Sequence, residues 1–224
     1  MAEIQYIDLK ECILQDNGSL ADEIRARLAK TKTFLLNIMS SPGAGKTTFI
    51  LDVVRRLKDQ FNIAVIEGDI ESRVDAVKIQ AEGIPAVQLR TGGDCHLDAA
   101  MIREGLERID LQHTDLVIIE NIGNLVCPAE FDLGASLSAM ILSVPEGDDK
   151  PLKYPLMFSV CKALIITKTD TKQCFDFDME RLRVNAGRLN PGLTIFEVSA
   201  KTGEGMDAWC DWLKAQVRHS INSD

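Results

Sequence analysis

The 224-residue chain lacks long apolar runs, since the longest ones (FLLNIM, LVII and ALII) have only the length of a strand. A helix that crosses a bilayer needs about 20 consecutive apolar residues, so the sequence predicts no membrane span. The opening residues, MAEIQYIDLKE, lack the basic segment and the following apolar stretch of a secretory signal. We therefore expect a cytoplasmic protein without a membrane partner.

The chain also lacks any stretch rich in lysine and arginine. Its 34 acidic residues outnumber its 25 basic ones, and the net charge is −9. Nucleic acids and anionic lipids are bound through concentrated positive charge. The charge balance therefore argues against a nucleic-acid partner and against electrostatic docking on a membrane.

Paired cysteines are missing too, because no CxxC motif occurs among the six cysteines of the chain. In a cytoplasmic protein, scattered cysteines are reduced thiols or metal ligands more often than disulfides. Most of the cysteines and histidines have no neighbouring ligand residue in the sequence and are not expected to bind metal: Cys12, Cys161, Cys174, Cys210, His113 and His219.

What the sequence contains is an alternation of short apolar runs with amphipathic stretches. Strands are predicted at 33–40, 63–69, 86–92, 115–121, 138–144, 163–170 and 193–200, and helices at 19–30, 46–60, 72–83 and 206–217. The strands are rich in Val, Ile and Leu without clean alternation, as in parallel strands covered on both faces. This pattern predicts an α/β fold, with a doubly wound, mostly parallel sheet and helices on both faces.

No repeat, low-complexity segment or linker divides the chain. We expect an N-terminal extension with one helix (1–32), one nucleotide-binding domain (33–219) and a short C-terminal tail (220–224). Ser19 is the expected N-cap of the helix in the extension. Trp209 and Leu213 share one face of the last helix.

The segment SSPGAGKTT (40–48) follows the first expected strand and opens a helix. In this context backbone N–H groups cradle phosphates, as in the P-loop of nucleoside triphosphatases. Lys46 would reach the β- and γ-phosphates, and the Thr47 hydroxyl would bind Mg²⁺. The expected phosphate contacts are Gly43, Ala44, Gly45, Lys46, Thr47 and Thr48. Ser40 replaces the usual first glycine, and the alternative is a glycine-rich turn without a ligand.

Two more strands end in carboxylates, Asp69 in IAVIEGD and Glu120 in DLVIIEN. The carboxyl ends of parallel strands form the edge where ligands bind, so either residue could hold Mg²⁺ or position water. Gly123 can offer an unhindered N–H to the γ-phosphate. The alternative for each acidic residue is a solvated strand end.

Two segments near the end of the chain bear on the base of the nucleotide. In ALIITKTD (163–170), Asp170 can accept two hydrogen bonds from guanine, and the stem of Lys168 can cover the base. In FEVSAKTGEG, a backbone N–H of Ser199, Ala200 or Lys201 can reach guanine O6. These segments resemble the NKxD and SAK motifs of GTPases, which favours GTP and GDP. Thr167 stands where Asn is usual, which puts loop anchoring and base discrimination in question.

The segment TGGDCHLD places Cys95 beside His96. Thiolate and imidazole suit Ni²⁺ and Zn²⁺, but adjacent residues cannot easily fill a coordination sphere, so a second subunit could donate further ligands. The alternative is that Asp94 caps a helix beginning near Leu97, with Cys95 packed and His96 solvated.

Four segments resemble one family: GDIESRVDA, TGGDCHLDAAMI, ENIGNLVCPAEFDLG and SVPEGDDKPLKYPLMF. They look like the nickel-incorporation GTPases of hydrogenase maturation, the HypB family of the signal-recognition/MinD-like P-loop GTPases, from about Phe34 to Leu213. The urease accessory GTPases are similar in fold, but their Cys-Pro-His motif is absent. The resemblance implies that Cys95, His96 and Cys127 bind Ni²⁺ or Zn²⁺ where two subunits meet.

The resemblance further implies a GTP-dependent homodimer that passes nickel to a hydrogenase large-subunit precursor through an accessory protein. Hydrolysis would yield GDP and phosphate, with Lys46 and Mg²⁺ (held by Thr47 and Asp69) stabilising the developing charge. Glu120 and Asp69 are candidates for positioning water or metal. The first residues carry neither the N-terminal cysteine motif nor the histidine-rich tract of many family members, so nickel handling is expected to rest on Cys95, His96 and Cys127.

Three alternatives stay open at this point. They are a urease-accessory-like nickel GTPase, a P-loop small-molecule kinase, and a metal-binding scaffold whose nucleotide site does not hydrolyse. The segment 147–155, GDDKPLKYP, could contact the nucleotide, a partner subunit or a partner protein, or be a solvated loop.

Overall fold

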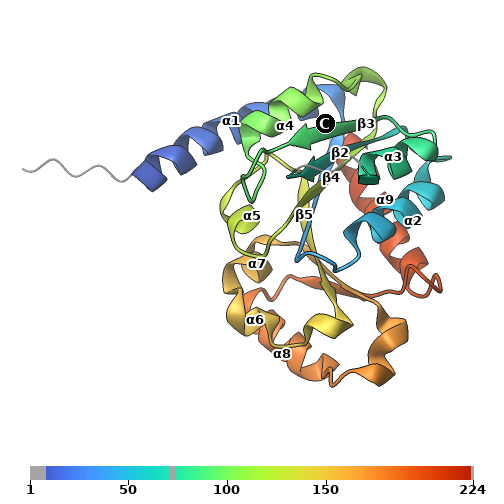
Figure 1. The fold of residues 1–224 in the computed structure, drawn as a ribbon. Coiled ribbons are helices and arrows are strands. Elements are labelled where there is room, and N and C mark those ends of the chain that lie inside the picture. The colour runs from blue at the N-terminus through green and yellow to red at the C-terminus, as the bar shows by residue number, and fades with distance from the viewer. Residues whose placement is uncertain (1–8, 71–73, 223–224) are drawn as a thin grey trace, which may run out of the picture.

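The computed structural model describes residues 9–70 and 74–222 (Figure 1). The strands are β1 (Phe34–Ser40), β2 (Ile63–Asp69), β3 (Ala86–Arg90), β4 (Leu116–Gly123), β5 (Leu137–Ser143), β6 (Ala163–Thr167) and β7 (Thr194–Glu197). The α-helices are α1 (Leu9–Thr31), α2 (Lys46–Leu57), α3 (Val74–Ala81), α4 (Ala99–Leu106), α5 (Cys127–Glu130), α6 (Lys150–Lys153), α7 (Pro155–Val160), α8 (Met179–Leu189) and α9 (Met206–Asn222). Three short 3-10 helices are η1 (Leu111–His113), η2 (Val144–Glu146) and η3 (Thr169–Cys174).

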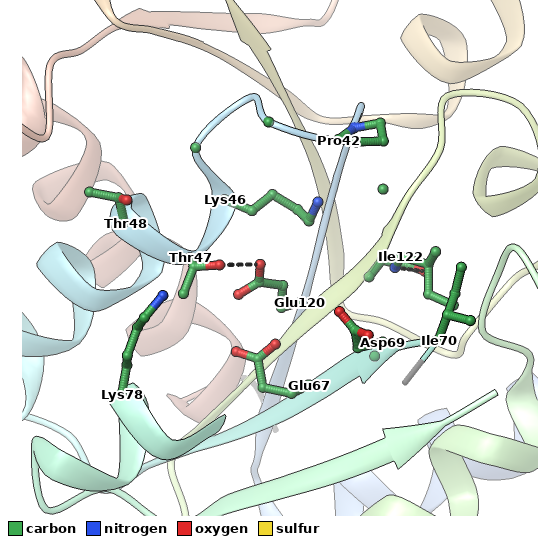
Figure 2. Close-up of a pocket in the computed structure, with 15 residues that line it drawn as sticks. Pro42, Lys46, Thr47, Thr48, Glu67, Asp69, Ile70, Lys78, Glu120 and Ile122 are labelled. Atoms are coloured by element: carbon green, nitrogen blue, oxygen red, sulfur yellow. Dashed lines mark hydrogen bonds between the residues drawn. The ribbon is translucent and has the colours of Figure 1, made fainter. Parts of the chain in front are cut away.

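The seven strands form one sheet in the order β3-β2-β4-β1-β5-β6-β7, and every neighbouring pair is parallel. The seven predicted strands are thereby confirmed, and so is the α/β class. Strand β1 lies between β4 and β5: the strands β2 to β4 lie on one side of it and β5 to β7 on the other, so the strand order reverses here. Ligands bind at such a switch point, outside the carboxyl ends of the strands. There the loop after β1 faces the ends of β2 and β4 (Figure 2).

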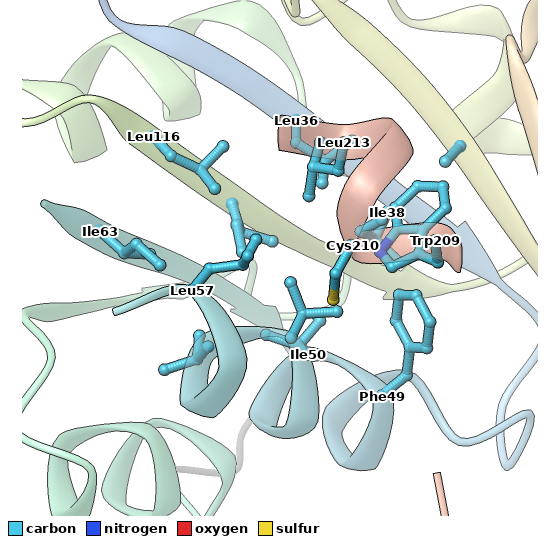
Figure 3. Packing of buried hydrophobic residues seen from close by; sticks show 14 of the residues in the cluster. Leu36, Ile38, Phe49, Ile50, Leu57, Ile63, Leu116, Trp209, Cys210 and Leu213 are labelled. Carbon is cyan, nitrogen blue, oxygen red and sulfur yellow. The ribbon is translucent and has the colours of Figure 1, made fainter. Parts of the chain in front are cut away.

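One face of the sheet is covered by α2 and α9. Along β1, Phe34, Leu36 and Ile38 all face this side and belong to one buried cluster with residues of both helices (Figure 3). Trp209 and Leu213 are fully buried in this cluster, as their spacing on the last helix predicts. This packing supports the loop between β1 and α2 at the carboxyl edge of the sheet.

Helices α1 and α4 cover part of the opposite face and lie side by side (Figure 1). Ala21, Ile24 and Leu28 of α1 are buried in one cluster with Leu35 of β1 and Ile102 of α4. A third cluster joins the sheet to α7 and α8. Helix α1 thus packs on the sheet itself, although it precedes the first strand.

The expectation for the start of this first helix is wrong. The helix begins at Leu9, and Ser19 lies in its interior, where its hydroxyl donates to the carbonyl of Gln15 over 3.2 Å. A serine in a helix can return its hydroxyl to the preceding turn instead of capping, and the sequence does not distinguish the two. The segment 147–155, considered a loop, contains α6 and the start of α7. Among the described residues, no helix is long and apolar enough to cross a bilayer.

Candidate functional site

The loop between β1 and α2 has the backbone that phosphate binding requires. Gly43 has φ of 76° and Gly45 has φ of 95°, values that favour glycine. Helix α2 begins at Lys46, and Gly45 has no side chain with which to cap it. The N–H groups of the first turn therefore face the loop without a competing side chain, as in phosphate-binding helix N-termini.

This loop borders a cavity of about 500 Å³ at the carboxyl edge of the sheet. Its walls are the loop and the ends of β2 and β4, with Lys78 of α3 at one side (Figure 2). Most of the predicted phosphate-side residues line it: Gly43, Gly45, Lys46, Thr47, Thr48, Asp69, Glu120 and Gly123. The tertiary structure thus brings together residues from three separate sequence motifs.

Carboxylates gather under Thr47 in this cavity. The Thr47 hydroxyl donates to Glu120 Oε1 over 2.8 Å (Figure 2). Glu67 and Glu120 lie opposite each other in the register of β2 and β4, and both are buried. Asp69, two residues further along β2, is half-buried and lines the same cavity. A hydroxyl with several carboxylate oxygens is the hard oxygen donor set that Mg²⁺ prefers, so the residues present fit this ion.

Glu67 is a residue of this cavity that sequence reasoning missed. A signal existed, since residues two apart in a strand point to the same face and Glu67 precedes Asp69 by two positions. The last residue of the strand, Asp69, was chosen because ligands bind beyond strand ends. The register of β2 against β4 is what places Glu67 beside Glu120.

Gly123 packs against the phosphate loop. A Cβ built on Gly123 would lie 3.0 Å from both the N and the Cα atoms of Pro42. Backbone atoms cannot easily give way, so any larger residue at 123 would displace the loop. The end of β4 and the phosphate loop therefore touch where a terminal phosphate would lie.

A second cavity of about 300 Å³ adjoins the first on the other side of Gly45. It is lined by the residues expected to recognise the base: Lys168, Asp170, Ser199, Ala200 and Lys201. Ala44, expected among the phosphate contacts, lines this second cavity and not the first. Ser199 Oγ donates to Asp170 Oδ1 over 2.8 Å and so orients the carboxylate. The Lys168 ammonium donates to the carbonyl of Gly43 over 2.8 Å.

Thr167 takes part in anchoring this cavity. Its hydroxyl, in a buried residue, donates to the carbonyl of Ala44 over 2.7 Å. A threonine at this position thus ties the base side to the phosphate loop. Thr167 replaces the asparagine that is usual at this position of the NKxD motif, and its hydroxyl makes a hydrogen bond that anchors the loop.

Cys95, His96 and Cys127 come together at the same edge of the sheet. One ligand atom from each lies within 4.8 Å of the others, and the two Sγ atoms are 3.1 Å apart. The neighbouring thiol of Cys127, together with desolvation, raises the pKa of Cys95. Two thiols and one imidazole are a donor set that fits Ni²⁺ or Zn²⁺ and leaves room for a further ligand.

The contacts around these three residues come from loops. Asn124 donates from Nδ2 to the carbonyl of Cys95 over 3.2 Å and accepts from Val126 N over 2.9 Å. The ring of Phe131 stacks on His96 with centroids 3.8 Å apart. The contacts of Asn124 with Cys95 and of Phe131 with His96 were not predicted, because each joins segments about 30 residues apart in the chain.

Helix α4 shows that the capping alternative for Asp94 is wrong. The helix begins at Ala99, and its N-cap is Asp98, whose carboxylate accepts from Met101 N over 2.8 Å. Cys95 is exposed and His96 is half-buried, the reverse of what that alternative requires. The pair therefore lies in the loop ahead of the helix.

The other cysteines and histidines lie elsewhere in the fold. Cys161 and Cys210 are buried, and burial raises the pKa of the Cys210 thiol to about 12. Cys174 is exposed in η3, and His113 is paired with Asp110 over 2.9 Å. The side chain of Cys12 lies outside the described residues.

Comparison with known proteins gives consistent matches. A family model described as the CobW/HypB/UreG nucleotide-binding domain matches residues 34–197. The hydrogenase maturation factor HypB of Escherichia coli (strain K12) is 45% identical over 96% of this chain and 74% of that protein. The hydrogenase/urease maturation factor HypB of Helicobacter hepaticus is 41% identical over 97% of this chain and 90% of that protein.

A solved structure is similar in three dimensions as well. The crystal structure of HypB from Helicobacter pylori in complex with nickel superposes with a TM-score of 0.87 at 39% identity. The superposition covers 93% of this chain and 98% of that chain.

Proposed function

The chain belongs to the HypB family of hydrogenase maturation factors, and from this premise we propose that it is a GTP-hydrolysing nickel metallochaperone. Its nickel would be delivered to the large-subunit precursor of a [NiFe]-hydrogenase through an accessory protein. Nickel is the cargo in this proposal, and GTP with Mg²⁺ drives its handling.

The nucleotide would lie across the two adjoining cavities. Its base would be held by Asp170 and by the backbone of Ser199–Lys201, because the carboxylate accepts from the two N–H donors that distinguish guanine from adenine. Its phosphates would lie on the N–H groups at the start of α2, with the Lys46 ammonium beside them. This arrangement favours GTP over ATP.

Hydrolysis needs stabilisation of the charge that develops on the terminal phosphate. Lys46 supplies a fixed positive charge at that position, and Thr47, Glu120, Glu67 and Asp69 are the residues that would hold Mg²⁺ and an attacking water. Bound Mg²⁺ would neutralise charge on the β- and γ-phosphate oxygens. Gly123, which lines the same cavity and carries no side chain of its own, would offer its N–H to the γ-phosphate.

The metal would be held by Cys95, His96 and Cys127. The same donor set accepts Zn²⁺, so the nickel assignment draws on the family rather than on ligand chemistry alone. Cys95 is exposed, and a second copy of the chain could complete the coordination across a two-fold axis. We therefore include a GTP-dependent homodimer in the proposal.

One observation carries this proposal: a single segment of chain joins the two sites. Gly123 touches the phosphate loop at Pro42, and Cys127 follows four residues later. A movement of this segment on hydrolysis would displace a metal ligand directly. In switch proteins, loss of the γ-phosphate likewise releases a loop and so changes a second site.

The decisive experiment is a titration of the full chain with Ni²⁺, with a non-hydrolysable GTP analogue and with GDP, while the oligomer mass is measured. The proposal predicts a metal affinity that differs between the two nucleotides, and a dimer with the analogue. An affinity independent of the nucleotide would make the metal site structural and refute the coupling.

A second candidate is a nickel GTPase that serves a urease. The observation that favours it is the name of the Helicobacter hepaticus relative, a hydrogenase/urease maturation factor. Deleting the gene and assaying both enzyme activities in its host, with and without added nickel, would separate the two clients.

A further inference from the structure

One buried side chain of α1 touches both segments that carry the metal ligands. Asn17 is 7% exposed; its Oδ1 accepts from Ala99 N over 2.8 Å, and its Nδ2 donates to the carbonyl of Asp132 over 2.8 Å. Ala99 follows His96 by three residues, and Asp132 follows Cys127 by five. Asn17 therefore bridges the two ligand segments, defined here as 95–99 and 127–134.

Helix α1 is held firmly enough to act as a support. Ala21, Ile24 and Leu28 are buried in the cluster that also contains Leu97, next to His96, and Leu133. A Cβ on Gly134 (φ 71°) would lie 2.6 Å from the carbonyl oxygen of Ala21, so the second ligand segment lies directly on the helix backbone. Such contacts leave little freedom for the helix to shift against either segment.

Charge at the surface adds to this attachment. Arg25 lies about two helical turns beyond Asn17 on α1. It forms ion pairs with Asp22 of its own helix and with Asp132. Exposed pairs contribute little, so the buried amide of Asn17 is the contact expected to set the geometry.

We propose that Asn17 is a positioning residue of the metal site, which fixes the spacing between Cys95–His96 and Cys127. The inference rests on the proposed metal site and adds to it an element outside the two ligand segments. An asparagine side chain is short and rigid, so its two hydrogen bonds set the separation of the two backbones. Residues that orient metal ligands without touching the metal typically change affinity about 10- to 100-fold when replaced.

A residue that only stabilises the fold would change stability without changing metal affinity, so a matched control is needed. Asn190 provides one, because its Nδ2 donates to the carbonyl of Cys161 over 2.7 Å and its Oδ1 accepts from Gly192 N over 3.1 Å. Like Asn17, it donates to a backbone carbonyl and accepts from a backbone N–H, with a further donation to the carbonyl of Phe158 over 3.1 Å, but it lies at the end of α8, away from the metal ligands.

The experiment compares Asn17→Asp with Asn190→Asp in the full chain. Asn17→Asp keeps an oxygen for Ala99 N, where the helix N-terminus favours negative charge, and replaces only the donor to Asp132. Affinity for Ni²⁺ alone is measured by titration well below the melting midpoint of each variant, with Cys95→Ser as reference. Asn17→Asp should bind Ni²⁺ about tenfold or more weakly, and Asn190→Asp should bind like the unaltered chain.

Equal Ni²⁺ affinities for Asn17→Asp and Asn190→Asp would overturn the positioning role, while a loss in Cys95→Ser would leave the metal site standing. A Cys95→Ser variant that binds like the unaltered chain would instead refute the metal site, and the inference with it. If Asn17→Asp does not fold, amide hydrogen exchange of the unaltered chain provides the test. Ni²⁺ should then slow exchange around Asn17 and at Ala99 but not at Gly192, and equal exchange with and without Ni²⁺ would overturn the proposal.

Discussion

The nucleotide cavity and the metal-ligand cluster lie at the same edge of one sheet, yet they are built differently. Around the nucleotide cavity, Glu67 and Glu120 are buried strand residues in fixed register across β2 and β4. In the metal-ligand cluster, Cys95 and His96 belong to a loop, and Cys127 begins a four-residue helix. The first site is positioned by the sheet, the second by polar side chains and by the packing of its loops on α1.

From this difference we infer that the sheet-borne nucleotide site is the more rigid of the two and the loop-borne metal site the more mobile. Parallel strands buried on both faces hold their side chains in place through many backbone hydrogen bonds. Loops without such a ladder of backbone hydrogen bonds open at lower cost. Two contacts join the rigid site to the mobile one. Asn124, next to Gly123, donates to the carbonyl of Cys95, and a Cβ on Gly68, at the end of β2, would lie 2.6 Å from Leu97 beside His96.

The largest effect is expected on the rigid side. Lys46→Ala should lower phosphate release from GTP by about a hundredfold to a thousandfold, because a fixed positive charge at the phosphates is lost. Ni²⁺ affinity without nucleotide should stay unchanged, since the Lys46 ammonium donates to Ser40 Oγ of its own loop. Lys58→Ala, just beyond the end of α2, is the control, and phosphate release equal to that of the control would contradict the GTPase proposal.

On the mobile side, Cys127→Ala, Cys95→Ala and His96→Ala should each lower Ni²⁺ or Zn²⁺ affinity on the order of a hundredfold. Each variant removes one of three donors that lie within 4.8 Å of one another. Cys174→Ala, which removes an exposed thiol in η3, is the matched control. Binding isotherms unchanged in all three variants would end the metal proposal.

The link between the two sites should show a smaller effect. Asn124→Ala removes two hydrogen bonds, one to the carbonyl of Cys95 and one from the N–H of Val126, next to Cys127. At about 1 kcal/mol each, their loss amounts to about 2 kcal/mol and should reduce the ratio of Ni²⁺ affinities with GTP analogue and with GDP by up to about thirtyfold. Asn62→Ala, at the opposite edge of the sheet, is the control, and an undiminished ratio would show that coupling runs through another contact, such as Gly68 with Leu97.

The smallest effect is expected at the base. Thr167→Val removes the hydroxyl that donates to Ala44, and GDP affinity should fall about fivefold, as for loss of one hydrogen bond. Thr33→Val removes a similar buried bond, from Thr33 to the carbonyl of Leu111, far from the cavity. Calorimetric titration should show weaker GDP binding for Thr167→Val alone, and equal affinities for the two variants would mean that Thr167 does not support the base side.

Much of the fold could be predicted because the signals are local. Seven apolar runs of strand length predict seven strands, and the loop 40–48 between a strand and a helix predicts the phosphate cavity. The start of α1 could not be predicted, since Ser19 is as suitable for a cap as for a helix interior. The burial of Asn17 and Ala21 against other segments keeps that region helical.

The sequence by itself determined which chemical groups are available: a phosphate loop, strand-end carboxylates, a guanine-type motif, and a Cys-His pair with a distant cysteine. Only the tertiary structure decided that Glu67 lies beside Glu120, that Asn124 joins Cys95 to Val126, and that Asn17 bridges the two ligand segments. The physical reason is that a motif depends on neighbours along the chain. These contacts depend instead on strand register and helix packing, which bring together residues that the sequence keeps far apart.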